Sequence, residues 1–275
     1  MKRYRILGFD FDTRVRSLDQ IPDAWDEQVK ELHRQSRDRT IKGLQDEHGI
    51  RGFEEKLQNF IDLGVKPFSV IAFHNRFYAQ ARSAFVHGQY YPALTAVCAL
   101  GERVLNHLVL GLRDHYKASP HYKRVYRKNS FDNWELALDA LHDWKVLTPS
   151  AEAAFRELWR RRNEAIHFNI GTEQNDRRDA LDALLIFGRV LESQFTCFGA
   201  LPWLFTPPGE VYIRKEWEDV PFIQLVYQPN ALYLGYKHRV VSVFPWKVED
   251  AEGYDTAEVT DEEFTRLRIQ QQSAT

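Results

Sequence analysis

The feature that most constrains this chain is a run of apolar residues at helical spacing between about residues 68 and 198. Apolar residues three and four positions apart lie on one face of an α-helix, and that face has to be buried against neighbouring elements. The breaks in the pattern predict about five helices, near residues 68–87, 92–112, 130–144, 149–168 and 176–198. This region should therefore fold as an antiparallel-type helical bundle.

Local signals support these helix boundaries. Gly88 follows the first stripe as a C-cap, and Pro92 stands where a helix start tolerates proline. Ser130 can cap the third helix, and Thr148 followed by Pro149 marks the start of the fourth.

The flanking regions have a different character. Before the bundle, residues 3–11 predict a short strand or extended lead, residues 22–48 one or two surface helices, and residues 53–63 an amphipathic helix. After Pro202 the helical spacing of apolar residues ends. Short segments rich in β-branched and aromatic residues predict three or four strands, at 211–217, 222–228, 231–237 and 240–246. Thr260 with Glu263 predicts a capping box for a last short helix.

We therefore expect a mostly α protein, α+β overall. Its predicted segments are an N-terminal helical extension (1–66), a helical bundle (67–200) and a small C-terminal β-rich module with an acidic tail (201–275).

Composition narrows the class of protein. Hydrophobic residues make up 44% and charged residues 28%, which is ordinary for a soluble globular chain. The apolar run before Asp10 is too short for a signal peptide, and no uninterrupted apolar run is long enough to span a membrane. The cysteines, Cys98 and Cys197, are expected to be buried reduced thiols. A cytoplasmic location is the resulting expectation.

The net charge of −2 conceals an uneven distribution. Residues 67–200 carry 17 basic and 14 acidic groups, whereas residues 201–275 carry 7 and 12. The bundle is thus mildly basic and the C-terminal part acidic. The near-zero total does not argue for or against a polyanionic ligand.

One segment of the fourth helix, RELWRRRNEAIHFN at 156–169, carries candidate chemistry. Position 162 belongs to the apolar stripe of Phe155 and Leu158, yet it holds Arg162. Burying an arginine on the apolar face of a helix has a large desolvation free energy unless the side chain is paired or binds an anion. His167 lies four residues after Asn163, on the same helical face. Histidine can transfer protons near neutral pH, and arginine can clamp a phosphate.

The string from Arg162 and Asn163 to His167 resembles the R-N-x-x-x-H motif of HEPN domains, which are four- to five-helix bundles. The helical stretch at 90–114 is similar to the second long helix of such bundles. The resemblance covers about half of the chain, and residues 1–66 and 201–275 lie outside it.

This resemblance implies metal-independent RNA cleavage in a homodimer that brings two motifs into one cleft, without a cofactor. His167 would act as general acid or base, and the ribose 2′-hydroxyl would be the nucleophile. Arg162 would bind the scissile phosphate, and Asn163 would orient His167 or the phosphate. Many such proteins are toxins or antiviral (anti-phage) effectors, so an antitoxin or regulatory partner is also implied.

Two alternatives remain open. Arg162 and His167 can be structural, as a buried ion pair and a helix-end histidine, in a bundle that serves as a non-catalytic scaffold for dimerisation, partner binding or RNA binding. In a third hypothesis, a regulated toxin, the acidic end at 249–275 mimics RNA and covers the basic cleft.

The connection at 113–128 interleaves basic and tyrosine residues. Basic groups contact phosphates, and tyrosines stack on unpaired bases, although a solvated loop with inward tyrosines has the same composition. The predicted RNA-binding residues are Lys123, Arg124, Arg127 and Lys128, together with Arg160 and Arg161 beside the motif. His74 and Glu102, polar groups in apolar helices, are candidate cleft-lining residues, although they can equally face solvent or a polar interior.

Other chemistries find little support. Close-spaced zinc ligands are absent from the sequence, as are the glycine-rich phosphate loops of nucleotide-binding proteins, so no metal site is predicted. Asp10 and Asp12 after a short strand suggest a haloacid-dehalogenase-like phosphatase, but Arg14 stands where that pattern has threonine.

Overall fold

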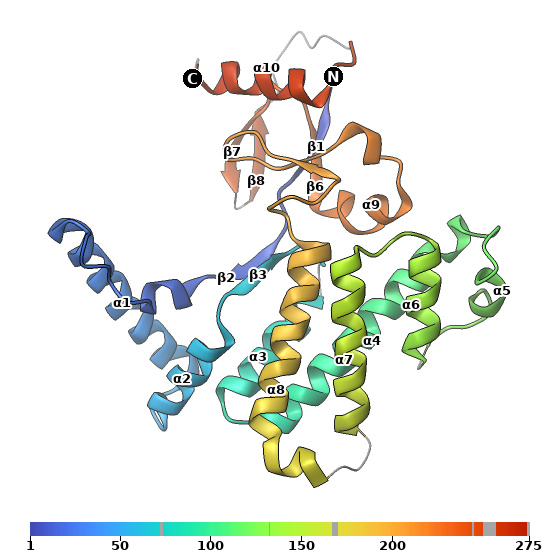
Figure 1. The fold of residues 1–275 in the computed structure, drawn as a ribbon. Helices are drawn as coiled ribbons and strands as arrows, with labels where there is room; N and C mark the ends of the chain where they lie inside the picture. The colour runs from blue at the N-terminus through green and yellow to red at the C-terminus, as the bar shows by residue number, and fades with distance from the viewer. Residues whose placement is uncertain (72–73, 132, 167–169, 244, 250–256, 274–275) are drawn as a thin grey trace. The chain divides into compact units, whose positions relative to one another are not determined.

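The computed structural model describes the chain except for residues 72–73, 132, 167–169, 244, 250–256 and 274–275 (Figure 1). Contacts divide the chain into two compact units. The larger unit is Asp10–Phe195, and the smaller one joins Met1–Phe9 to Thr196–Thr275. The protein is mostly helical with small sheets, so the expected fold class, mostly α and α+β overall, is confirmed.

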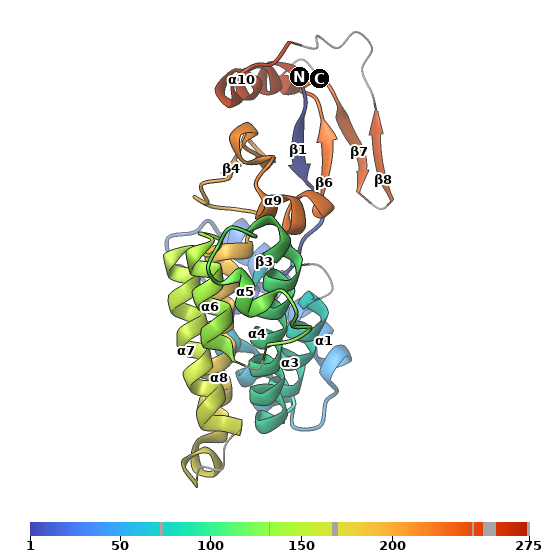
Figure 2. The same ribbon diagram turned by 90° about the vertical axis from the view of Figure 1, so that its right-hand side faces the viewer.

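The larger unit is a helical bundle built around one central helix. Its helices are α3 (His74–Val86), α4 (Tyr90–Leu112), α6 (Trp134–Asp143), α7 (Pro149–Ile166) and α8 (Ile170–Val190), which a π-helical turn (Leu191–Phe195) extends. α4 packs against α3, α6, α7 and α8 (Figure 2). The apolar stripes face this interior, where Val97, Leu105, Phe155 and Leu184 are buried.

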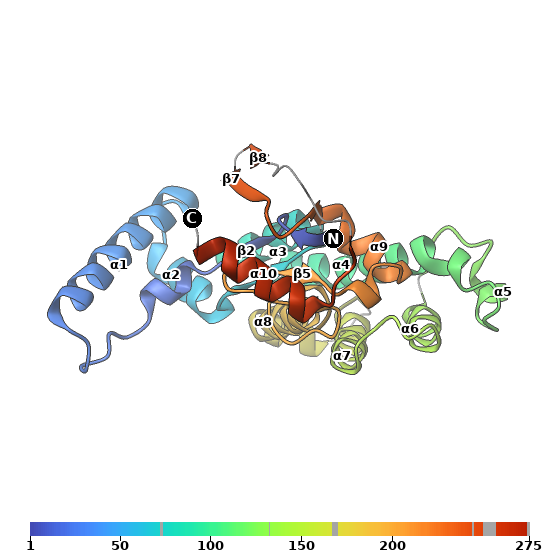
Figure 3. The ribbon, with the colours of Figure 1, turned by 90° about the horizontal axis from the view of Figure 1, so that it is seen from above.

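Smaller elements around the bundle complete the larger unit. α1 (Glu27–His48) packs on α2 (Phe53–Leu63) and on a 3₁₀ helix (Arg14–Leu18), and α2 contacts α3 (Figure 3). The strands β2 (Asp10–Asp12) and β3 (Lys66–Ser69) form a short antiparallel pair. Between α4 and α6 lie a 3₁₀ turn (Arg113–His115) and the one-turn helix α5 (Tyr122–Val125).

The observed helix ends can be compared with the cap residues that the sequence predicts. Gly88 adopts a left-handed φ of 74° after α3, and the Thr148 hydroxyl accepts from the Ala151 amide at the start of α7, as predicted. The third helix starts later than Ser130, because the Asn133 side chain accepts from the Leu136 amide and so caps α6. In α8 the non-helical Asn175 precedes the segment predicted as the fifth helix.

The smaller unit contains a four-stranded antiparallel sheet in the order β4 (Leu204–Phe205), β5 (Tyr212–Ile213), β1 (Arg3–Ile6) and β6 (Ala231–Leu234). A separate hairpin joins β7 (Arg239–Val243) to β8 (Trp246–Glu249). Its helical elements are 3₁₀ turns at Lys215–Trp217 and Gln228–Asn230, α9 (Pro221–Val226) and α10 (Asp261–Ser273). The Thr260 hydroxyl accepts from the Glu263 amide and caps α10, which is one half of the predicted capping box, while the Glu263 carboxylate pairs with Arg266.

The smaller unit corrects one strand prediction. The sequence predicts a strand at 222–228, but Pro221–Val226 is the helix α9, with Pro221 in its first turn. Phe222, Ile223 and Val226 are buried, and their spacing fits one face of a short helix as well as a strand core.

The two units differ from the three predicted segments. Residues 1–9 belong with the C-terminal part because β1 pairs with β5 and β6, and residues 10–66 pack with the bundle. Buried ion pairs hold the smaller unit together. Arg268 donates to both carboxylate oxygens of Glu210, which also pairs with Arg5.

The helix with its following turn, Tyr90–His115, is the one candidate membrane span in the described part of the chain by length and composition. Of its most apolar window, 56% is buried inside the protein. Its apolar character is accounted for by its central position in the bundle.

Candidate functional site

Arg162 lies in the last turn of α7 and faces α4. Its Nη2 donates to Glu102 Oε2 over 3.5 Å, and its Nη1 donates to Asn163 Oδ1 over 3.2 Å. The buried Nε has no hydrogen-bond partner among the described residues. A guanidinium has five N–H donors, and charge-assisted bonds are usually about 2.7–2.9 Å long, so Arg162 is only loosely held and keeps donors for another anion.

Glu102 connects three helices at this point. It lies on α4, and the oxygen that faces Arg162 also accepts from Trp134 Nε1 of α6 over 3.1 Å. Trp134 is fully buried, so its indole fixes the position of the carboxylate. Glu102 therefore sets where the Arg162 side chain lies at the end of α7.

The rest of the predicted motif is only partly described. Asn163 accepts from its neighbour Arg162, and Ala165 is buried. His167 lies outside the described residues, so its predicted role remains a prediction. The roles of Arg162 and Asn163 likewise stay predictions.

The predicted RNA-binding residues of the 113–128 connection are exposed. Lys123, Arg124, Arg127 and Lys128 have no ion-pair partner within the described ranges. Arg113 shapes the segment, because its Nη1 donates to the carbonyl oxygens of Val125 and Lys128.

The tyrosines of this connection lie in different settings. Tyr122 and Tyr126 stack with ring centres 5.5 Å apart, and the Arg127 guanidinium lies over the Tyr126 ring. Tyr116 instead stacks on Trp144. Aromatic rings therefore lie beside the exposed cations, an arrangement that RNA binding by residues 113–128 would need.

Asn106 tethers the end of this basic connection to α4. Its amide nitrogen donates to the Phe131 carbonyl over 2.8 Å, and its oxygen accepts from the Phe131 amide over 2.5 Å. The Lys128 ammonium lies over the Phe131 ring. Asn106 is one helical turn from Glu102, so the basic connection and Arg162 meet the same segment of α4.

The two arginines beside the motif have different surroundings. Arg160 is exposed. Arg161 pairs with Asp182 at 2.9 Å and Asp179 at 3.5 Å, both on α8, and with Glu164 at 3.8 Å. These carboxylates offset the positive charge of Arg161, so Arg160 is the better placed of the two to contact a phosphate.

His74 is not joined to the Arg162 cluster by its described contacts. It lies buried in α3, contacts the Ile71 carbonyl and packs edge-to-face on His107 of α4, with ring centres 5.4 Å apart. Burial, together with the nearby His107 and Arg103, lowers the pKa of His74 to about 4. The imidazole is therefore neutral near pH 7.

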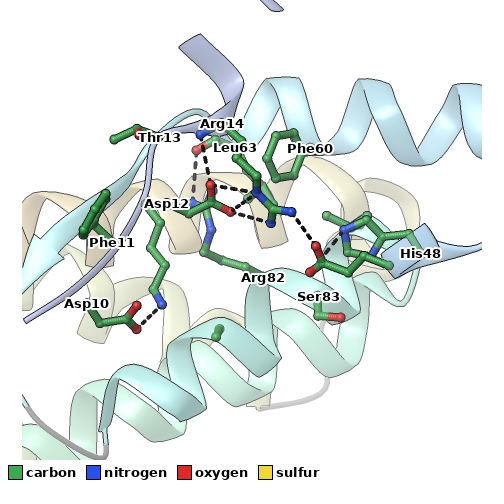
Figure 4. Close-up of a pocket in the computed structure, with 14 residues that line it drawn as sticks. Asp10, Phe11, Asp12, Thr13, Arg14, His48, Phe60, Leu63, Arg82 and Ser83 are labelled. Atoms are coloured by element: carbon green, nitrogen blue, oxygen red, sulfur yellow. Dashed lines mark hydrogen bonds and ion pairs between the residues drawn. The ribbon is translucent and has the colours of Figure 1, made fainter. Parts of the chain in front are cut away.

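A cleft with a volume of about 500 Å³ lies between the β2 segment, the end of α1, α2 and α3 (Figure 4). Its charged groups neutralise one another. Asp12 pairs with Arg14 at 2.7 Å, Arg14 with Glu47 at 2.6 Å, and Lys66 with Asp10. Arg82 also lines the cleft and donates to the carbonyl oxygens of Leu63 and Gly64. Three basic side chains therefore balance three acidic ones, and the lining offers no net positive charge to an anion.

This pairing also explains the aspartate pair near the N-terminus. Arg14 donates to both carboxylate oxygens of Asp12. Burial opposes ionisation of Asp12, but the hydrogen bonds and charge of Arg14 hold its pKa below the ordinary value. Arg14, which breaks the phosphatase-like pattern, is thus the ion-pair partner of Asp12.

The described residues bear on two sequence hypotheses, a metal site and an acidic C-terminal segment that covers the basic cleft. Within them, no group of three or more histidine, cysteine or acidic side chains is placed to hold a metal ion. Of the acidic segment, Asp261 and Glu258 pair with Arg3, and Glu263 pairs with Arg266. These carboxylates are engaged within the smaller unit.

Sequence reasoning missed several residues around the site. The apolar pattern places Trp134 in the core, yet its indole nitrogen also holds Glu102. Asn106 is four positions after Glu102, so helical spacing signals a shared face.

Comparison with protein-family models, with curated proteins and with solved structures finds no match to this chain. Function is therefore inferred from the residues themselves.

Proposed function

We propose that this protein is a metal-independent endoribonuclease of the HEPN type. The observation that carries the proposal is the loosely held Arg162 on α7, whose Nη1 and Nη2 keep N–H groups beyond the bonds to Asn163 and Glu102, beside a segment of α4 that also anchors a basic connection. A partly buried guanidinium with spare donors suits a bound phosphate, and exposed cations and tyrosines suit the flanking chain.

The proposed reaction is transfer within the RNA backbone. The ribose 2′-oxygen attacks the phosphorus, the bond to the 5′-oxygen breaks, and a 2′,3′-cyclic phosphate and a free 5′-hydroxyl are formed. A base removes the proton of the 2′-hydroxyl, and an acid supplies one to the leaving oxygen. His167 is proposed for this proton transfer, and Asn163 for its orientation or that of the phosphate.

Arg162 would act electrostatically in this scheme. Its N–H donors would bind the non-bridging oxygens, where negative charge increases in the transition state. Glu102 would hold the guanidinium in place through one carboxylate oxygen. A homodimer would bring two such motifs into one cleft. The resemblance to HEPN domains extends the proposal to a role as a toxin or defence effector with a regulatory partner.

The test is cleavage of a mixed-sequence RNA by purified protein in EDTA. We expect wild type to form cyclic-phosphate ends, detected by mass spectrometry, and His167→Ala to lose the activity. Arg162→Lys keeps the charge but loses the planar fork, so its rate should fall at least about tenfold. Arg189→Gln, on the exposed surface of α8, is the matched control and should cleave normally.

Equal cleavage by wild type and His167→Ala would contradict the proposal. A folded wild-type protein that binds RNA without cutting it would instead favour the scaffold alternative. Light scattering on the purified protein checks the dimer, and a strict monomer that cleaves would overturn the shared-cleft part.

A further inference from the structure

A second cationic surface lies on α3 and α4, outside the residues predicted from sequence. Phe77 of α3 contacts two arginines: the guanidinium carbon of Arg76 is 5.7 Å from its ring centre, and that of Arg103 on α4 is 5.3 Å away. We refer to Arg76, Phe77 and Arg103 as the arginine–phenylalanine patch. Cation–π contacts of this kind restrict where the two guanidinium groups lie.

The positive charge of this patch is not neutralised locally. Arg76 and Arg103 are exposed, and neither has a carboxylate within ion-pair distance in the described part of the chain. The α3 segment contains no acidic residue. The one acid of α4 is Glu102, which faces Arg162. By contrast, Arg156 and Arg161 of α7 are paired with carboxylates.

The patch is continuous along α4 with the proposed cleavage site. Arg103 follows Glu102 directly in the chain, and Arg103, Asn106 and His107 share one helix face because they are three and four positions apart. Asn106 anchors the end of the basic connection that carries Lys128. The segment 102–107 thus links Arg162, the basic connection and the patch.

We propose that the arginine–phenylalanine patch is a binding subsite for single-stranded RNA, flanking the nucleotide that reacts. This inference rests on the proposed function, because it assigns the patch to a part of the RNA substrate beyond the nucleotide that is cleaved. Arg76 and Arg103 contact successive phosphates of the strand, and their planar guanidinium groups stack on unpaired bases. The exposed His107, packed against His74, lies on the same face and offers a ring edge to a base.

The experiment measures RNA binding separately from cleavage. All variants carry His167→Ala so that RNA stays intact, and the probe is a fluorescently labelled single-stranded RNA of about twelve nucleotides. Arg76→Gln combined with Arg103→Gln should weaken binding about tenfold in roughly 50 mM salt. Loss of two phosphate contacts should also reduce the slope of log Kd against log salt by about 1.4, because each contact to a single strand contributes about 0.7.

The matched control is Arg37→Gln with Arg39→Gln, which removes two exposed charges from α1. It should leave the affinity and the salt slope nearly unchanged. A second variant, Phe77→Leu, keeps an apolar side chain but removes the ring, and should weaken binding by a smaller factor. Circular dichroism melting confirms that each variant is folded.

Three outcomes would overturn the proposal: unchanged binding in the double variant, an equal loss in the α1 control, or an equal loss for an RNA duplex of the same length. The proposed nuclease can fail independently. If unmutated protein binds RNA but cuts nothing while the double variant loses binding, the subsite stands and the nuclease function does not.

Discussion

The guanidinium of Arg162 lies 3.5 Å from the carboxylate of Glu102, and that carboxylate is held by an indole from a third helix. This relationship positions a cation at the end of α7 without fully satisfying it. The same carboxylate places a negative charge beside the proposed phosphate site, so Glu102 has two opposing effects there.

Glu102→Gln should separate those effects. The amide keeps a partner for Trp134, but it removes a negative charge next to the phosphate and weakens the hold on Arg162. We expect RNA affinity to rise by about two- to fivefold and the single-turnover cleavage rate to fall by about tenfold. Binding and rate measurements on the same RNA check this. A change of both in the same direction would contradict the positioning role.

Gly101→Ala should destabilise the bundle. A Cβ built on Gly101 would lie 2.6 Å from the Trp134 indole and 2.8 Å from a Leu158 methyl, closer than van der Waals contact allows. Overpacking of this kind costs about 1–3 kcal/mol, which urea unfolding can measure.

Gly43→Ala is the matched comparison for that substitution. Gly43 lies within α1, and a Cβ added there would have no neighbour within 4 Å. Alanine at this position should stabilise the helix by up to about 1 kcal/mol, because glycine loses more backbone entropy on folding. If both variants destabilise the protein equally, steric crowding at Gly101 is not the cause.

Protonation of His74 should make stability fall at mildly acidic pH. Burial lowers its folded-state pKa from 6.5 to about 4. Between these values the unfolded chain takes up a proton that the folded protein does not, so stability is full above about pH 6.5 and decreases toward pH 4. The loss is at most about 3 kcal/mol.

Urea unfolding at several pH values between about 7.5 and 4.5 measures this effect. His74→Asn should show a shallower decrease than wild type, whereas His115→Asn, in the turn after α4, should match wild type. A wild-type slope in His74→Asn would show that other groups cause the acid sensitivity.

Both cysteines should be unreactive in the folded protein. Cys98 and Cys197 are fully buried and form no disulfide, and burial raises the pKa of each thiol to about 12. Because the thiolate is the reactive form, a chromogenic disulfide reagent should detect almost no thiol in native protein and both thiols in guanidinium chloride. Rapid reaction of one thiol in native protein would contradict this burial.

Much of the helical architecture could be predicted from local patterns. The apolar stripes of α4 and α7 follow the helical period, and the caps at Thr148 and Thr260 are recognisable within a few residues. The strand prediction at 222–228 was wrong because a short apolar run fits a strand and a helix equally well. The helical state of that segment depends on what it packs against.

The sequence by itself determined which segments form the bundle helices and that a cation interrupts the apolar stripe of α7, because periodicity and capping act over a few residues. Only the tertiary structure decided that β1 joins strands more than 200 residues away in the smaller unit, and that Arg14 also pairs with Glu47 of α1. It also decided that Glu102 and Trp134 position Arg162. These contacts depend on how the chain packs, and no local pattern encodes which partner a buried polar group will meet.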